Sequence, residues 1–197
     1  MKIVLSFLFL LFTGNSFALV PNDALTFDFN IKTIKVSRAK EYKLDQSVEL
    51  LKEIFASPEF RKRIMNHRFK GRRAFAHNKG MSNSQIYYKI LAGAEKLLPY
   101  QNNAMDVEVE LYTKNDSTVI GYTKSLSRRI WMNTKYFNRH SYGEVASHLT
   151  HEWLHKLGFD HEKERTPHRK YSVPYAVGYI VRDLARKFSD ARLGQRF

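Results

Sequence analysis

Three histidines and one glutamate lie within the eleven residues HEWLHKLGFDH, at positions 151–161. Residues four apart in a helix share one face, so His151 and His155 can direct imidazole nitrogens at a single ion. Glu152 is rotated about 100° from His151 by the helical period, which places a carboxylate beside the ion without making it a ligand. This pattern is typical of metal-assisted hydrolysis, in which the carboxylate takes a proton from a metal-bound water that attacks a carbonyl.

A catalytic zinc site usually has three protein ligands plus water. His161 is the natural third ligand, but it lies six residues after His155 and would point away on a continuous helix. Gly158 removes this difficulty, because glycine accepts the left-handed conformation that ends helices and lets the chain turn back. We therefore predict one bound zinc ion, with Glu152 as the general base. The predicted zinc ligands are His151, His155 and His161.

A simpler interpretation of the stretch is a helix end whose histidines are exposed to solvent or satisfied in the core. That interpretation leaves the spacing of Gly158 and His161 unexplained. His148, three residues before His151, could be an additional or alternative ligand. We favour a packed or surface histidine there, because three ligands are already supplied.

The pattern H-E-x-x-H-x-x-G-x-x-H resembles the zinc signature of the metzincin metallopeptidases. The longer stretch HEWLHKLGFDHEKER, residues 151–165, looks like the astacin branch of that family. Phe159, Glu162 and Arg165 match the continuation of the astacin pattern. The resemblance implies that the three histidines bind zinc and that Glu152 is the general base of a metallopeptidase.

The chain departs from the family pattern after the motif. Metzincins carry a methionine beneath the metal, whereas no Met follows His161, and residues 172–175 (SVPY) resemble the astacin turn without its Met and His. In astacins the turn tyrosine binds zinc or stabilises the oxyanion, so the resemblance makes Tyr175 a second predicted catalytic residue. Tyr171 and Tyr179 compete for this role, and a packed tyrosine without any catalytic role stays an alternative.

Regular hydrophobic patterns surround the motif. Alternation predicts strands at residues 26–36, 72–76, 105–112, 118–124 and 128–133. Helical spacing, with Ser82–Gln85 and Ser141–Glu144 as capping boxes, predicts helices at residues 45–56, 58–67, 82–98, 141–157 and 177–188.

This order of elements predicts an α+β fold, in which the last three strands form an antiparallel meander. The last of them, RRIWMN at 128–133, is expected at or near an edge. The resemblance implies a metzincin-like zincin fold with a mostly antiparallel mixed sheet, an upper helix, a zinc-binding helix and a C-terminal part ending in a helix. It also implies an edge strand above the cleft that pairs with extended substrate, for which 128–133 is the candidate.

The start of the chain indicates export. Residues 1–18 have one Lys, an apolar run from Ile3 to Phe12 and a small-x-small ending, which is typical of a signal peptide cleaved after Ala18. The apolar run is too short to span a bilayer, although a retained anchor is the alternative. We expect residues 19–197 to form a single catalytic domain, with 19–45 as a possible N-terminal extension.

The composition of the chain limits which metal ligands, nucleophiles and binding partners are to be expected. With no Cys in the chain, thiolate ligands and a thiol nucleophile are excluded. The formal charge of +14 favours anionic surroundings, and no specific nucleic-acid motif is present. We predict a monomeric periplasmic or extracellular enzyme that acts on peptide or protein substrates at an anionic cell envelope. The alternatives are a non-catalytic protein that holds zinc or binds the envelope, and a basic envelope- or nucleic-acid-binding module with structural histidines.

Overall fold

The structure is a computed structural model that describes residues 26–194, with side chains as far as residue 191. The predicted signal peptide, residues 1–18, lies outside the described residues. Within the described part, residues 28–45 of the predicted 19–45 extension form the first strand and the start of the first helix. This part of the chain contains no helix with the length and apolar character needed to cross a membrane.

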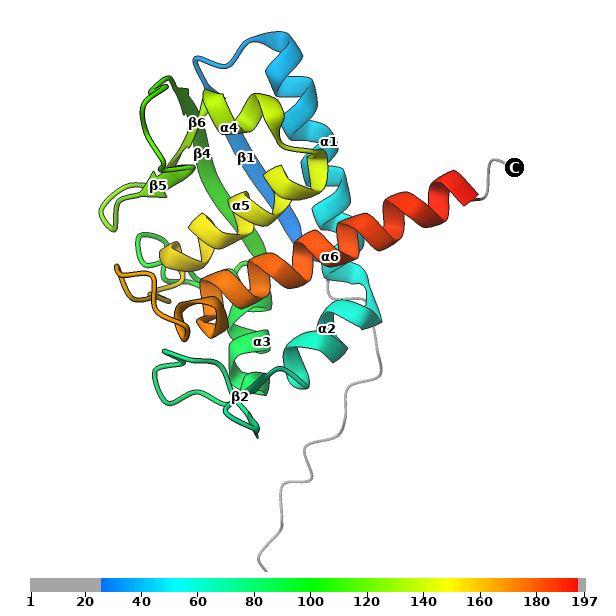
Figure 1. Cartoon of the computed structure of the whole chain (residues 1–197), viewed down its shortest axis with the longest axis vertical. Helices are drawn as coiled ribbons and strands as arrows, with labels where there is room; N and C mark the ends of the chain where they lie inside the picture. Colours follow the sequence, from blue (N-terminus) through cyan, green and yellow to red (C-terminus); the bar gives the residue numbers. More distant parts are fainter. Residues whose placement is uncertain (1–25, 195–197) are drawn as a thin grey trace, which may run out of the picture.

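A four-stranded mixed sheet in the order β1-β4-β6-β5 forms one layer of an α+β fold (Figure 1). The strands are β1 (Asp28–Ile34), β4 (Ala104–Tyr112), β5 (Gly121–Thr123) and β6 (Arg129–Asn133). β1 and β6 pair with β4 in parallel, and β5 pairs with β6 antiparallel. The prediction of a mostly antiparallel sheet is therefore wrong, because two of its three pairings are parallel.

The segment that follows β4 causes this order. Residues 113–120 cross the position next to β4, which β6 fills later in the chain. β5 is therefore at the edge of the sheet, and β6 lies between β4 and β5. Asn133 at the end of β6 holds the segment, because its side-chain amide donates to the carbonyls of Lys114 (2.9 Å) and Val119 (3.3 Å). RRIWMN is consequently an internal strand, and the edge position predicted for it belongs to β5.

The two faces of the sheet differ, as the alternation in β4 predicts. Val107 and Val109 are buried on the face that the helices cover. On the opposite face the guanidinium of Arg129 lies between two carboxylates of β4, 2.6 Å from Glu110 and 3.3 Å from Glu108. The sheet thus presents one face to the core and the other to solvent.

Helices form the second layer. They are α1 (Arg38–Ala56), α2 (Pro58–Met65), α3 (Asn83–Ala92), α4 (Thr134–Arg139), α5 (Tyr142–Lys156) and α6 (Val173–Gly194), with a 3-10 turn η1 (Arg169–Tyr171) before α6. α5 packs against α1 and the β5–β6 side of the sheet, and α6 crosses the molecule along α5 (Figure 1). Aromatic rings from α1, α2 and α5 meet in the core. The ring of Phe55 stacks on that of Phe60 with 4.6 Å between centroids, and its centroid lies 6.2 Å from that of Trp153.

α3 is shorter than predicted. It ends at Ala92 because Gly93 takes the left-handed conformation, with φ +65°. A Cβ on Gly93 would lie 2.2 Å from the carbonyl oxygen of Ala104, so only glycine allows β4 to begin this close to the helix end. Leu97, which falls within the predicted helix 82–98, lies in the following loop and is 41% exposed.

The strand predicted at 72–76 is also shorter. Only Arg72–Arg73 forms a strand, β3, which pairs antiparallel with β2 (Arg68–Phe69). Ala76 instead donates its backbone N–H to the carbonyl of Tyr171, at 2.8 Å. This bond ties the 68–80 segment to the chain entering α6, close to the zinc motif.

Candidate metal centre

The helix that carries the motif begins at a capping box, as predicted. The Ser141 hydroxyl accepts from the backbone N–H of Glu144, and the Glu144 carboxylate accepts from the backbone N–H of Ser141. From this start the helix runs to Lys156, which places His151 and His155 one turn apart near its end. Local sequence therefore sets the phase of the two ligands on the helix.

Gly158 ends the helix and turns the chain back. Its φ is +92°, and its N–H donates to the carbonyl of His155, while the N–H of Phe159 donates to the carbonyl of Leu154. These two bonds form a Schellman motif, which requires a left-handed residue at this position. Phe159 is then fully buried, and His161 comes back over the helix.

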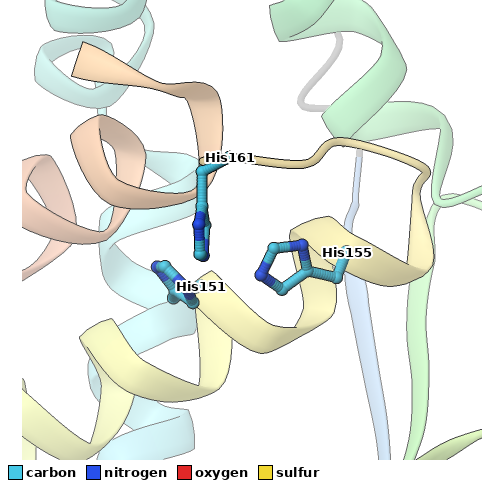
Figure 2. A group of neighbouring side chains, drawn as sticks. All are labelled: His151, His155 and His161. Atoms are coloured by element: carbon cyan, nitrogen blue, oxygen red, sulfur yellow. The ribbon is translucent and has the colours of Figure 1, made fainter. Parts of the chain in front are cut away.

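The three predicted ligands converge. His151 and His155 project from α5 and His161 from the loop after it, with the three rings turned toward a common point (Figure 2). One nitrogen from each ring lies within 4.8 Å of the other two, and the ring centroids are 4.9–5.2 Å apart. These three residues lie close enough to hold a metal ion.

Backbone carbonyls orient the rings. Nδ1 of His155 lies 2.8 Å from the carbonyl of Phe159, and Nδ1 of His161 lies 2.8 Å from the carbonyl of Glu162. His151 hydrogen-bonds the backbone of Pro174, which has no N–H, so the partner is its carbonyl. One nitrogen of each ring is thereby held as a donor, which leaves the other as a lone-pair ligand.

The protonation state of the histidines also suits a metal. Burial is the largest cause that lowers the pKa of each histidine, well below the ordinary value for His151. Neighbouring imidazoles lower the pKa of His151 and His155 further, and the Arg169 guanidinium does so for His161. Neutral imidazoles are the form that binds a metal. The donor set of three neutral histidines without thiolates matches a catalytic zinc site with one open position.

Glu152 follows His151 on α5, lines the same cavity as the three histidines and is only 5% exposed. Burial raises the pKa of Glu152 to about 8, and the positive charge of Lys156 opposes this rise. A carboxyl group with a pKa near neutrality can both accept and return a proton. Glu152 and the three predicted ligands thus line the same cavity.

Tyr175 is the predicted tyrosine that reaches this centre. Its ring lies 4.5 Å from the ring of His151 and 4.7 Å from that of His161, and the Arg169 guanidinium covers it at 4.9 Å. Tyr179 lines the same cavity one turn further along α6, whereas Tyr171 packs against Phe69 at 5.5 Å. The SVPY segment thus brings the Tyr175 phenol beside two of the predicted ligands.

His148 is not part of the ligand group. Its Nε2 lies 3.9 Å from Oε1 of Glu152, and burial lowers the pKa of the His148 imidazole to about 3. The edge strand approaches this ring so closely that a Cβ on Gly121 would lie 2.2 Å from the His148 Nε2. His148 is a packed histidine of the motif helix, and its ring lies against β5.

The motif extension anchors its loop to the rest of the molecule. The Glu162 carboxylate accepts from the hydroxyl of Thr166, and its Oε1 lies 3.0 Å from Nε2 of His77. Asp160 forms an ion pair with Lys79 at 3.2 Å. The loop that carries His161 is therefore held to the 68–80 segment at the residue before His161 and at the residue after it.

Two buried groups of the site have no counterpart among the predictions. Glu95 accepts from the indole N–H of Trp153 at 2.7 Å and from the backbone N–H of Asp106 at 3.0 Å, which links α5 to β4. Lys156 is 5% exposed and points into the β5–β6 connection. The only sequence signal for either group is a charged residue beside apolar ones, which does not distinguish burial from exposure.

A cavity of about 860 Å³ runs over the metal centre. One wall is the 118–125 segment with β5, and the other is formed by α5, the 160–169 loop and the start of α6. Basic side chains outnumber acidic ones along it. The cations are Lys96, Lys163, Arg165, Arg169 and Arg182, and the acids are Glu144, Glu152 and Asp160.

Comparisons of the chain with protein-family models, with curated proteins and with solved structures found no match.

Proposed function

We propose that this protein is an exported zinc-dependent metallopeptidase. The observation that carries the proposal is the convergence of His151, His155 and His161 beside the buried Glu152, in the floor of an open cavity. The resemblance to the metzincin signature supports the same conclusion, as does the break of the motif helix at Gly158. A metzincin-type fold is part of the proposal.

The residues would share the chemistry as follows. When bound, a zinc ion supplies Lewis-acid chemistry that polarises a peptide carbonyl and acidifies a water molecule. Glu152 accepts a proton from the attacking water at its carboxylate and passes it to the nitrogen of the leaving amine. Tyr175 donates its hydroxyl to the oxyanion that develops on the carbonyl. The three histidines would hold the ion through the ring nitrogens that are not hydrogen-bonded to backbone carbonyls.

The cavity supports a peptide as the substrate class. β5 is the edge strand, so its free side can pair with an extended chain laid along the cavity. The excess of cations in the lining favours acidic segments of that chain, and the formal charge of +14 favours an anionic envelope as the place of action.

The second candidate function is a protein that holds zinc without catalysis. The observation in its favour is residues 172–175, where SVPY stands in place of a methionine turn. The presence of Glu152 argues against this second candidate, because a carboxylate that is buried without a chemical role lowers the stability of the fold.

Bound zinc and peptide hydrolysis should be measured for the wild type, Glu152→Ala and His155→Ala. Glu152→Ala should keep one zinc ion and lose kcat/KM by about 10²–10⁴-fold, because only the proton acceptor is removed. His155→Ala should lose both zinc and activity. Matched controls are Glu164→Ala and His168→Ala, which alter exposed residues of the 160–169 loop.

Each candidate has its own outcome. Full activity in Glu152→Ala would rule out the proposed mechanism. Tight zinc binding by the wild type without turnover of any member of a peptide panel would favour the zinc-holding protein. Envelope binding that needs no zinc but weakens with salt would favour a basic binding module.

A further inference from the structure

Lys156 follows the second ligand of the motif and is buried at the end of α5, with 5% of its surface exposed. A buried ammonium is costly unless each of its three donors has a partner. All three donors are used by one short segment. Nζ donates to the carbonyls of Lys124 at 3.0 Å and Arg129 at 2.9 Å, and also to the carbonyl of Ser127.

These acceptors belong to the connection between β5 and β6. The connection folds around the ammonium, so that three carbonyls separated by up to five residues face one atom. With all three donors engaged, none is left to hydrogen-bond Glu152, although Lys156 lies one turn after it on α5. Lys156 therefore attaches a strand pair to the motif helix.

A second contact attaches the other end of the hairpin. Gly121 at the start of β5 lies against the ring of His148, close enough that an added Cβ would meet the His148 Nε2 at 2.2 Å and the Trp131 carbonyl oxygen at 2.5 Å. His148 and Lys156 are eight residues apart, which is about 12 Å along the helix axis. Two attachments at this separation set both the distance and the direction of β5 relative to α5.

We propose that Lys156 is a positioning residue: its ammonium fixes the β5–β6 hairpin on α5 and so sets the wall of the cavity on which an extended substrate is aligned. This role rests on the proposed peptidase function. β5 and the 118–125 segment form that wall, directly opposite the metal ligands. Lys156 does not line the cavity itself, so it acts through the hairpin.

The test compares zinc-loaded wild type with Lys156→Met, which keeps most of the apolar stem and removes the ammonium. Lys62→Met, an exposed lysine of α2, is the matched control for the lost charge. Amide hydrogen exchange of residues 118–129 reports the hairpin. Steady-state kinetics on a ten-residue peptide and on a blocked dipeptide separate alignment along β5 from chemistry at the ligands.

Lys156→Met should keep one zinc ion and exchange the 118–129 amides about 10-fold faster or more, because charge-assisted hydrogen bonds are lost. KM for the ten-residue peptide should rise about 10-fold with kcat changed little, and kcat/KM for the dipeptide should stay near wild type. Lys62→Met should match the wild type in every measurement. If Lys156→Met does not fold, Lys156→Gln, which keeps one amide donor group, should show the same pattern to a smaller degree.

Unchanged exchange at 118–129 would overturn the proposal, and so would equal losses on the long and the short substrate. If the wild type cleaves no peptide, the peptidase function fails, while hydrogen exchange still decides whether Lys156 holds the hairpin.

Discussion

The two walls of the cavity are built in different ways. The wall formed by α5 and the start of α6 carries His151, His155, Glu152 and Tyr175, and these helices are packed into the hydrophobic core through side chains such as Leu149 and Val177. The opposite wall is a three-residue edge strand that offers backbone groups and is attached to α5 at Lys156 and Gly121. The residues proposed for chemistry thus lie on the rigid helices, where small displacements are costly, and the wall proposed for substrate alignment is held by few contacts.

After Glu152→Ala, the largest effect on activity is expected at the hydroxyl of Tyr175. Tyr175→Phe should lower kcat by roughly 10²-fold with zinc content unchanged, because one donor to the oxyanion is removed while the ring stays. Peptide kinetics with metal analysis would measure this. Tyr171→Phe, which lies outside the cavity, is the control, and equal kinetics for Tyr175→Phe and the wild type would leave Tyr175 as a packing residue.

The attachment of α5 to the core can be tested at Trp153. Trp153→Phe removes the indole donor from the buried Glu95 and should lower the free energy of unfolding by about 1–3 kcal/mol. Urea denaturation would show this. Trp131→Phe, on the solvent face of the sheet, should cost less, and equal costs would mean that the Glu95 bond contributes little.

The other wall is expected to respond to Gly121. Gly121→Ala places a Cβ against His148 and the Trp131 carbonyl, so β5 must shift, at a cost of about 1–3 kcal/mol. KM for a long peptide should rise while bound zinc stays at one ion per chain. Loss of zinc instead would mean that the two walls are not independent.

The smallest effect is expected at the two helix starts, which differ in one functional group. Ser141→Ala and Ser82→Ala should each cost about 1 kcal/mol at pH 7, because each removes the cap of its helix. Hydrogen bonding to Ser141 lowers the pKa of Glu144 below its ordinary 4.5, so this carboxylate stabilises the fold above that pH and the contribution is lost as the pH falls through the lowered value. Ser141→Ala keeps the backbone N–H bond to this carboxylate, which is the larger cause, and removes the hydroxyl bond. Its cost should therefore shrink in acid by the part that the hydroxyl bond contributes.

The corresponding partner of Ser82 is Gln85, an amide that does not titrate. The cost of Ser82→Ala should accordingly be the same at pH 7 and pH 3, provided that the protein is folded at both. Urea denaturation of both variants against the wild type would check this pair. A parallel decline in acid would point to a global cause instead of Glu144.

The sequence alone determined the metal-site geometry to a large extent. The capping box at Ser141, the four-residue spacing of His151 and His155, and the left-handed Gly158 act within a few residues of one another, so local backbone rules suffice to predict them. Regular alternation likewise predicted β4, and helical spacing predicted five of the six described α-helices to within about two turns but missed α4.

Only the tertiary structure decided what depends on distant segments. The sheet order, with β6 between β4 and β5, rests on contacts of Asn133 with the 114–119 segment, and no local pattern encodes which strands become neighbours. The burial of Lys156 and Glu95 was equally hidden, because a charged side chain is buried only where another part of the chain supplies its partners. Short-range backbone geometry brings the three histidines together, whereas the long-range pairing of strands forms the cavity wall that faces them.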